Sequence, residues 1–284
     1  MVTVENLHYQ YSGNKEETIK GISFEINSGE IFGFLGPSGA GKSTTQKILT
    51  GMLRDYKGKA EILGTSVLQW DRRLYEHIGI SFEFPNLFLK LTASENLNFF
   101  ASLYSGPVSR SEELLTRVGL EKEADMRVEK FSKGMKMRLN FIRSLLHQPK
   151  ILFLDEPTSG LDPANARNVK NIILKEREKG KTVCITTHNM TVAEELCDRV
   201  AFIAYGNLPL IDTPRNMMVA RSRKTVRVEW EEKDALLQEE FPLENLGGNK
   251  HFLTLIAEKP VQTIHSQEAN LEDIFIEVTG ARLA

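Results

Sequence analysis

The chain has 284 residues and lacks any apolar run near the roughly 18 residues that a membrane-spanning helix needs. Its N-terminus has no charged stretch followed by an apolar core, so we expect a chain that neither spans a membrane nor is exported. Cys184 and Cys197 are the only two cysteines and fit no metal-site spacing, so we expect buried thiols in a reducing cytoplasm. The net charge of −2, from 36 basic and 38 acidic residues, gives no electrostatic case for broad nucleic-acid binding.

A glycine-rich loop is the most informative motif of the sequence. Residues 36–43 read Gly-Pro-Ser-Gly-Ala-Gly-Lys-Ser and follow the apolar run at 31–35, which predicts a strand. This is the phosphate-binding P-loop pattern, in which glycines let backbone N–H groups approach a polyphosphate. Lys42 adds a charge toward the outer phosphates, and Ser43 offers a hydroxyl to Mg²⁺. The sequence therefore predicts a nucleoside triphosphate site, with contacts from Gly36, Pro37, Ser38, Gly39, Ala40, Gly41, Lys42, Ser43 and Thr44.

Two adjacent carboxylates follow a second apolar run far downstream. Residues 151–154 are typical of a buried strand, and Asp155 and Glu156 come directly after it. Carboxylates at the end of a buried strand need a charged partner, which Mg²⁺ supplies beside a P-loop. We assign Asp155 to the metal and Glu156 to the attacking water, as general base or orienter. The competing interpretation is that both residues only cap the helix after Pro157.

Further motifs stand before, between and after these two, and in this order they resemble those of the ATP-binding cassette (ABC) ATPases over about residues 1–214. Residues 131–135 stand where that family has its Leu-Ser-Gly-Gly-Gln signature, and residues 159–162 match its D-loop. His188 matches the switch histidine, and Tyr11 has the spacing of the aromatic residue that stacks on adenine. The resemblance implies an ATPase that uses Mg²⁺.

Within the signature segment (131–135), Ser132 and the second glycine, Gly134, are retained. The resemblance implies that this segment contacts the ATP of a second subunit, and it places Asp162 among the nucleotide-binding residues. Ser132 is also the predicted N-cap of a helix over 135–146, and the two roles are compatible. The remaining signature positions differ, with Phe131, Lys133 and Met135 replacing the family's leucine, first glycine and glutamine.

Two further residues are candidates for the catalytic site. Glu83 stands where the family usually has glutamine, and we expect it close to the metal, the alternative being a solvated loop acid. His188 follows the apolar strand at 183–185, at the sheet edge where α/β proteins bind ligands. There it could bridge the γ-phosphate and Glu156, whereas a lone histidine after a strand is more often structural.

The predicted fold is α/β, a P-loop NTPase core with a mostly parallel sheet. Residues 2–7 and 22–26 alternate like strands of an N-terminal antiparallel β subdomain, and about 91–148 predicts a helical subdomain. Within that subdomain, 92–95 begins one helix and 109–120 forms another. We assign 1–214 to the nucleotide-binding domain and 215–284 to a small α+β accessory domain.

In the accessory segment, 225–230 and 251–256 predict strands and 271–278 predicts a helix. That helix should face inward through Leu271, Ile274, Phe275 and Val278. We interpret the basic stretch of Arg215, Arg221, Arg223, Lys224 and Arg227 as a solvated linker. The closing segment at 271–275 is similar to that of exporter-type cassettes.

The stretch from Phe82 to Tyr104 is rich in aromatic residues. In the family, a groove at this place receives a short helix from the membrane subunit, and Phe84, Leu87 and Phe88 are the best candidates for that contact. The alternative is that most of these rings belong to the core, and for any single ring that interpretation is favoured.

The leading hypothesis is the ATPase subunit of an ABC transporter, closing on ATP as a head-to-tail dimer and driving separate membrane-spanning subunits. It would lie in the cytoplasm at the inner face of the membrane, touching it only through those subunits, with export favoured over uptake. A soluble ABC ATPase acting on ribosomes or DNA is the alternative, and a P-loop kinase would leave residues 132–134 and Asp162 unexplained. The substrate and the choice between homodimer and heterodimer stay open.

Overall fold

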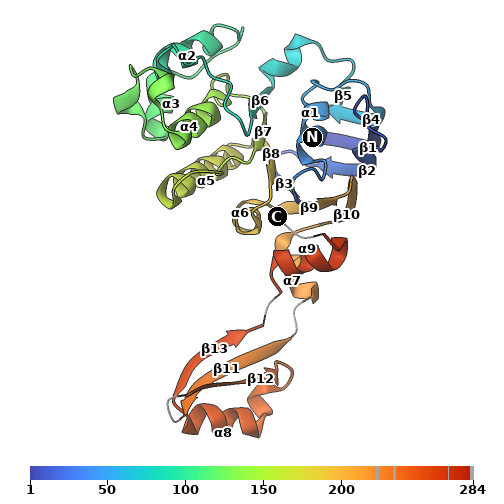
Figure 1. Ribbon diagram of the computed structural model, residues 1–284, viewed down its shortest axis with the longest axis vertical. Coiled ribbons are helices and arrows are strands. Elements are labelled where there is room, and N and C mark those ends of the chain that lie inside the picture. The colour runs from blue at the N-terminus through green and yellow to red at the C-terminus, as the bar shows by residue number, and fades with distance from the viewer. Residues whose placement is uncertain (222–223, 233–234, 268, 282–284) are drawn as a thin grey trace.

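A six-stranded sheet forms the centre of the computed structural model, which describes residues 1–221, 224–232, 235–267 and 269–281 (Figure 1). The strand order is β10-β9-β3-β8-β7-β6, and all neighbours are parallel except β10 with β9. The mostly parallel sheet expected for a P-loop core is therefore confirmed. Its strands are β3 (Ile31–Leu35), β6 (Ile78–Ser81), β7 (Ile151–Asp155), β8 (Thr182–Thr187), β9 (Arg199–Ala204) and β10 (Asn207–Asp212).

The N-terminal segment contributes a second, antiparallel sheet in the order β2-β1-β4-β5. In it β1 pairs with both β2 and β4, so that Val2 faces Ile26 on one side and Ile62 on the other. The antiparallel subdomain expected from the alternating sequence is confirmed. Its strands are β1 (Val2–Tyr9), β2 (Ile19–Ile26), β4 (Lys57–Ile62) and β5 (Thr65–Ser66).

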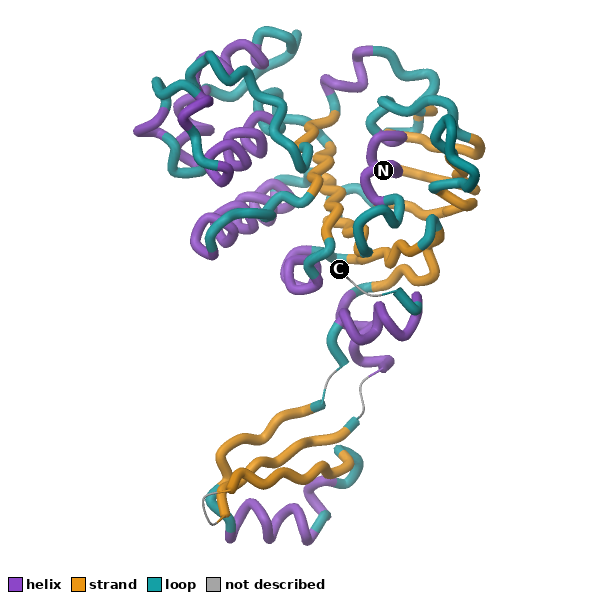
Figure 2. The backbone as a smooth tube through the Cα atoms, viewed as in Figure 1, coloured by secondary structure: helices purple, strands orange, loops and turns teal. Residues whose placement is uncertain are grey.

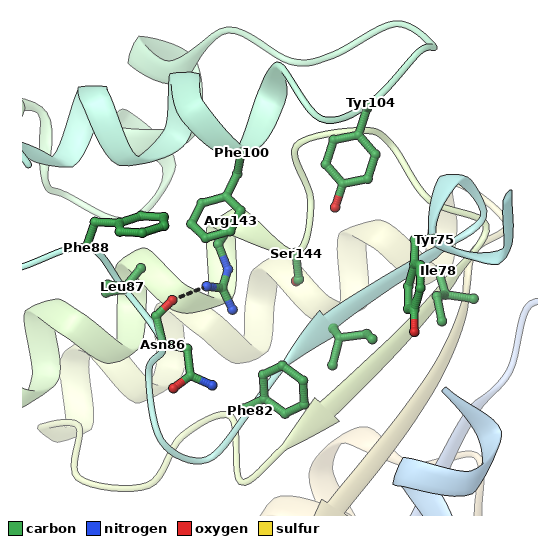
Figure 3. Close-up of a pocket in the computed structure, with 11 residues that line it drawn as sticks. Tyr75, Ile78, Phe82, Asn86, Leu87, Phe88, Phe100, Tyr104, Arg143 and Ser144 are labelled. Carbon is green, nitrogen blue, oxygen red and sulfur yellow. Dashed lines mark hydrogen bonds between the residues drawn. The ribbon is translucent and has the colours of Figure 1, made fainter. Parts of the chain in front are cut away.

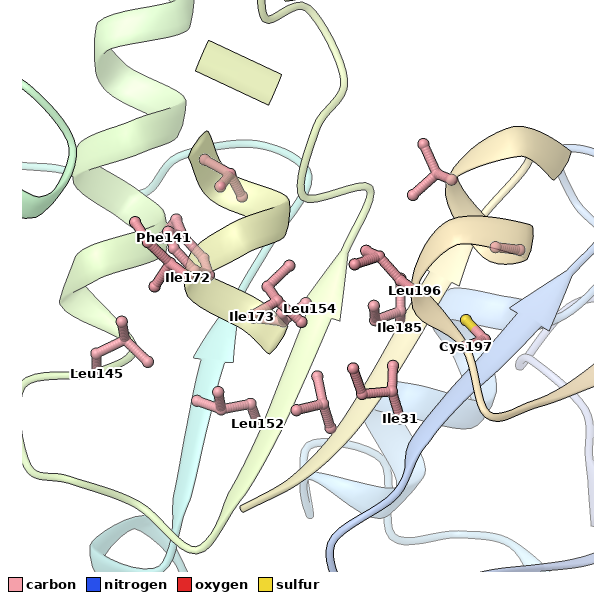
Figure 4. Close-up of a cluster of buried hydrophobic side chains, with 14 of the residues drawn as sticks. Ile31, Phe141, Leu145, Leu152, Leu154, Ile172, Ile173, Ile185, Leu196 and Cys197 are labelled. Atoms are coloured by element: carbon pink, nitrogen blue, oxygen red, sulfur yellow. The ribbon is translucent and has the colours of Figure 1, made fainter. Parts of the chain in front are cut away.

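Two apolar cores lie on the two faces of the main sheet. Successive strand residues point to opposite faces, and in β7 Leu152 and Leu154 join one core while Ile151 and Phe153 join the other. Figure 4 shows the first core, where the helices α4 (Lys133–Arg143), α5 (Pro163–Glu178) and α6 (Met190–Leu196) cover the sheet. The second core holds the N-terminal sheet and α1 (Lys42–Leu49) against the other face.

Helices α2 (Ala93–Ala101), α3 (Ser111–Arg117) and α4 gather on one side of the main sheet, as Figure 2 shows. Thr92 and Glu95 form a capping box at the start of α2, and Ser132 caps α4 by accepting a bond from the Met135 N–H at 3.2 Å. Both predicted starts are therefore found. The helix expected over 109–120 is shorter, because Gly119, with φ of 63°, follows its last turn.

The segment after β10 contains α7 (Pro214–Arg221) and a three-stranded sheet in the order β12-β11-β13. Residues 251–256, expected as a strand, instead lie in α8 (Lys250–Glu258). Asn249 caps this helix, and Phe252, Leu255 and Ile256 repeat with helical spacing on the face toward the sheet. The sheet has its own small core, and its strands are β11 (Thr225–Glu232), β12 (Ala235–Pro242) and β13 (Val261–Ser266).

The basic stretch expected as a linker is largely structured. Arg215 and Arg221 lie on α7, where Arg221 pairs with Glu277 at 3.6 Å, and Arg227 lies in β11. Lys224 precedes β11, and Arg223 falls outside the described residues. Pro214 occupies the first position of α7, where proline is common at a helix start. The prediction of a linker did not take this proline into account.

The final helix, α9 (Leu271–Thr279), packs back onto the main core as expected. Leu271, Ile274 and Phe275 are fully buried, Val278 packs against the same cluster, and the Phe275 ring meets Phe202 of β9 at 5.2 Å. The chain thus leaves the main fold after α7 and returns to it at α9. No helix among the described residues is long and apolar enough to cross a membrane.

Candidate nucleotide site

The P-loop joins the buried strand β3 to α1 and curls around the side chain of Lys42. The Lys42 ammonium group donates hydrogen bonds to the carbonyls of Gly36 at 2.6 Å and Pro37 at 3.0 Å. A Cβ atom at Gly36 would lie 2.1 Å from the carbonyl oxygen of Ile203, so no other residue fits there. Gly41, directly before α1, has φ of 115°, a conformation that favours glycine.

A cavity of about 450 Å³ opens over this loop. Among the predicted site residues, it brings together most of the P-loop, the two carboxylates at the end of β7, Glu83, Tyr11 and His188. Gly36, Pro37 and Ala40 support the loop without lining the cavity. The lining residues are Tyr11, Asn14, Thr18, Ser38, Gly39, Gly41, Lys42, Ser43, Thr44, Glu83, Asp155, Glu156 and His188.

Asp155 ends β7 directly beside Ser43. The Ser43 hydroxyl donates to Asp155 Oδ1 at 3.4 Å, and the Thr186 hydroxyl donates to the same oxygen from the neighbouring strand β8. These two bonds fix the carboxylate next to the predicted metal-binding hydroxyl. Sequence reasoning missed Thr186, although a pair of threonines at the end of an apolar strand was a visible signal.

Glu156 is held by a separate set of donors at the end of β8. Its Oε1 accepts the backbone N–H of His188 at 2.9 Å and lies 2.6 Å from His188 Nδ1. Its Oε2 accepts the Thr187 hydroxyl at 2.9 Å. The Glu156 carboxylate is therefore fixed and almost buried, whereas the His188 side chain is about half exposed, at 51%. The imidazole thus extends from the carboxylate toward the open cavity.

Burial and nearby charge act against each other at Lys42. Burial lowers the pKa of the ammonium group, and this effect outweighs the raising effect of the Glu156, Asp155 and Glu83 carboxylates. A lysine in such a position gains stability from any further anion that enters the cavity. The electrostatics therefore favour a polyphosphate, whose charge would compensate the partly desolvated cation.

At the mouth of the cavity, the Tyr11 hydroxyl lies 3.2 Å from Thr44 Oγ1, and the Tyr11 ring packs edge-on against Tyr9 at 4.9 Å. Asn14 and Thr18 complete this wall. Both were missed because they lie between two strands, in a loop whose sequence carries no phosphate-binding pattern.

The oxygen donors suit Mg²⁺. Ser43 and Asp155 offer one hydroxyl and one carboxylate side by side, and Mg²⁺ takes few protein ligands and completes its shell with phosphate oxygens and water. Within the described part of the chain, no group of three or more His, Cys, Asp or Glu side chains could hold a metal by itself. This arrangement fits a metal that arrives with its nucleotide.

Ser132, Gly134 and Asp162 do not line this cavity. Ser132 caps the N-terminus of α4, and Asp162 caps the N-terminus of α5. The signature segment and the D-loop lie next to each other, outside the cavity. Lys133 runs across the D-loop, where a Cβ atom at Gly160 would lie 3.3 Å from Lys133 Cε. Residues of the signature segment thus have no access to the nucleotide site of their own chain.

A second cavity of about 530 Å³ lies between β6 and the helices α2 and α4 (Figure 3). Leu87 and Phe88 line this groove as expected, together with Phe82, Phe100 and Tyr104. Phe84 does not line it, although its side chain is 75% exposed. The groove therefore combines aromatic rings with the buried guanidinium group of Arg143. Its full lining is Tyr75, Ile78, Ile80, Phe82, Asn86, Leu87, Phe88, Phe100, Tyr104, Arg143 and Ser144.

A P-loop, a hydroxyl–carboxylate pair suited to Mg²⁺ and a carboxylate held beside a histidine are together the features of a nucleoside triphosphatase. Residues 19–159 match the family model described as ABC transporter, and residues 224–268 match one described as fluoroquinolone efflux ABC transporter C-terminal domain. The chain thus belongs to the ATP-binding proteins of ABC transporters. It is an ATPase that uses ATP and Mg²⁺.

Known proteins support this membership over the whole chain. A fluoroquinolones export ATP-binding protein of Mycobacterium tuberculosis is 49% identical over 284 residues, covering 100% of this chain and 94% of that protein. A bacitracin transport ATP-binding protein of Bacillus licheniformis is 31% identical, with 93% of both chains covered. An ATP-binding cassette solved as a dimer in a post-hydrolysis state with ADP and Pi superposes with a TM-score of 0.69 at 28% identity, covering 75% of this chain and 98% of the other.

Proposed function

We propose that this protein hydrolyses ATP in a head-to-tail dimer and thereby drives export of a small drug-like molecule through separate membrane-spanning subunits. The observation that carries the proposal is the division of the motifs between two surfaces. The P-loop and both carboxylates face one cavity, whereas Ser132, Gly134 and Asp162 lie outside it. A second cassette, identical or not, would bring its signature segment over the open γ-phosphate side of this site.

In the proposed hydrolysis step, Glu156 Oε1 or Oε2 accepts hydrogen bonding from the attacking water and orients it toward the γ-phosphate. Thr187 and the backbone N–H of His188 hold this carboxylate in place. As an imidazolium, the His188 ring would donate through Nδ1 to Glu156 and through Nε2 to the γ-phosphate, and its charge would stabilise the negative charge that develops there. Mg²⁺, held by Ser43 and Asp155 with Glu83 beside them, would neutralise the phosphate oxygens.

The groove of Figure 3 is the proposed docking site for the membrane subunit. It is apolar, partly exposed and connected to the nucleotide cavity by the segment 82–86, because Phe82 lines the groove and Glu83 lines the cavity. A short amphipathic helix would fit such a groove. This supports a cytoplasmic location at the inner face of the membrane. We propose a nucleotide-binding domain, 1–214, and an accessory segment, 215–284, in which the three-stranded sheet and α8 share a core of their own while α9 packs onto the main core.

The full-length similarity to a fluoroquinolones export protein supports a planar aromatic drug as the substrate class. The test expresses the chain together with its membrane subunit in a host lacking its own efflux pumps and measures accumulation of a fluorescent fluoroquinolone. We expect accumulation to fall several-fold with the wild type and to remain unchanged with Glu156→Gln.

A matched control expresses the wild-type chain without the membrane subunit. Equal accumulation in all three strains would refute the drug assignment. Co-purification of the Glu156→Gln chain with ribosomes or DNA, instead of with a polytopic membrane protein, would refute the transporter role.

A further inference from the structure

Two buried polar side chains on α4 form hydrogen bonds to the loop that carries Glu83. Asn140 and Arg143 lie one turn apart on this helix, with exposed fractions of 0% and 9%. The Asn140 amide donates to the Phe82 carbonyl at 2.8 Å and to the Ser81 hydroxyl at 3.1 Å. Arg143 donates to the Asn86 carbonyl, a bond that Figure 3 marks. The two side chains therefore hold both ends of the segment 82–86.

Asn140 and Arg143 are also hydrogen-bonded to each other. One Arg143 nitrogen donates to Asn140 Oδ1 at 2.8 Å, and the guanidinium group lies over the Phe100 ring at 4.6 Å. Among the described residues no carboxylate pairs with Arg143, and burial lowers the pKa of its guanidinium group more than the nearby Tyr104 raises it. Neutral acceptors and a ring face thus satisfy a buried cation. Such networks are rigid when complete and costly when one member is removed.

Few other hydrogen bonds hold the 82–86 loop in place. Residues 83–87 form no backbone–backbone hydrogen bond in the described structure; beyond Asn86, Leu87 packs against the main core and the Phe88 N–H donates to Asn96 Oδ1 at 2.9 Å. Glu83 is exposed and nevertheless lines the nucleotide cavity. Its position there consequently depends on the anchors at Phe82 and Asn86.

We propose that Asn140 and Arg143 are positioning residues that hold the 82–86 loop, and with it Glu83, at the nucleotide cavity. The opposite end of the same helix carries Ser132. The inference rests on the proposed function for the role of Glu83, but the holding of the loop can be measured separately.

The experiment compares the full chain with Asn140→Asp, which keeps the size and the acceptor for Arg143 but loses the donor to Phe82. Arg143→Lys tests the bond to Asn86, because lysine keeps the charge but lacks the planar guanidinium group that bonds to both Asn86 and Asn140. Asn168→Ala is the matched control, because its amide likewise donates from a helix to a backbone carbonyl distant in sequence, that of Arg117 at 2.9 Å, and does not contact the loop.

The first readout is amide hydrogen exchange of the Phe88 N–H, followed in a peptide covering 82–90, because this amide closes the loop by donating to Asn96 Oδ1 at 2.9 Å. We expect exchange there to rise by about tenfold in Asn140→Asp and Arg143→Lys and to stay unchanged in Asn168→Ala, because the loop opens once an anchor is lost. Unchanged exchange in both anchor variants would overturn the proposal.

Steady-state ATPase is the second readout. We expect Asn140→Asp to lower kcat by about tenfold with KM for ATP within about twofold, since a misplaced group affects the reaction more than binding. In a Glu83→Ala background the same change should lower kcat by less than about twofold. An equal loss in both backgrounds would show that Asn140 does not act through Glu83.

The role of Glu83 in the proposed function is tested separately from the holding of the loop. If Glu83→Ala retains the wild-type kcat and Mg²⁺ dependence, the role assigned to Glu83 is wrong. The exchange data then still decide whether Asn140 and Arg143 hold the loop.

Discussion

Glu176 of α5 is a buried carboxylate at the junction between the helical subdomain and the main sheet, and its neutralisation should destabilise the fold. Its side chain is 1% exposed and contacts Arg117 of α3 at 2.6 Å, Lys179 at 2.8 Å and Lys181 at 2.6 Å. Burial raises the pKa of this carboxyl, but hydrogen bonds from the three cations outweigh burial and lower it to about 2. We predict that Glu176→Gln loses this stabilisation.

The pKa shift sets the magnitude. A carboxyl that titrates near 4.5 when unfolded and at about 2 when folded is stabilised by roughly 3 kcal/mol, at about 1.36 kcal/mol per unit. The Lys179 side chain is 58% exposed, so solvent screens its share and we expect about 2 kcal/mol. Because the folded pKa is depressed, this stabilisation is complete above pH 4.5 and disappears as the pH falls toward 2.

The assay is urea unfolding followed by tryptophan fluorescence. The chain has two tryptophans, and Trp230 lies in the separate C-terminal sheet, so a Trp230→Phe background leaves Trp70 to report the main fold. With a slope of about 2 kcal/mol/M, Glu176→Gln should lower the midpoint by about 1 M at pH 7. The difference from the parent should shrink between pH 5 and pH 3, within the window described above.

Glu195→Gln is the control, since Glu195 pairs with Lys170 on the surface and is 48% exposed. We expect no measurable change in its midpoint. A midpoint for Glu176→Gln equal to that of the control, or a difference independent of pH, would refute the reasoning about Glu176.

Three further predictions concern the site and its surroundings. His188→Ala should retain binding of a fluorescent ATP analogue but lose about 100-fold in turnover, and a near-normal rate would remove the histidine from the mechanism. Gly36→Ala should abolish nucleotide binding, because its Cβ would lie 2.1 Å from the Ile203 oxygen; calorimetric titration with ATP checks this. Burial lowers the pKa of His147 to about 4, so the wild type should lose up to about 3 kcal/mol as the pH falls from 6.5 to 4. A His147→Gln variant should lack that part of the pH dependence, measured as Tm at each pH.

Local motifs predicted most of the nucleotide site. The P-loop, Asp155, Glu156 and His188 are each adjacent to an apolar strand of the sequence, and strands of a parallel sheet end at one edge. Residues 251–256 were assigned the wrong structure because a short apolar run fits both a strand and a helix, and only the cap at Asn249 distinguishes them.

Residues that act through distant partners could not be predicted. Asn140 lies on a buried helix face where any apolar residue would fit the helical pattern, and its partners, Ser81 and Phe82, precede it by almost 60 residues. Similarly, the carboxylate of Glu176 and the guanidinium of Arg117 belong to two separate amphipathic helices. Their pairing follows from the packing of the subdomain, which the sequence pattern does not specify.

Asp155 and Glu156 are consecutive residues, yet both side chains line the same cavity, and the backbone conformation of Glu156 explains how. Neighbouring residues of a strand point to opposite faces, so two consecutive carboxylates would not normally serve one cavity. Glu156 has φ of 46°, a left-handed conformation that costs a residue with a side chain about 1–2 kcal/mol. The Glu156 N–H remains bonded to the Thr186 carbonyl at 2.9 Å, while its side chain turns to Thr187 and His188. The strain is therefore located at the residue whose carboxylate we propose to face the γ-phosphate, and this turn of the backbone lets both carboxylates line the same cavity.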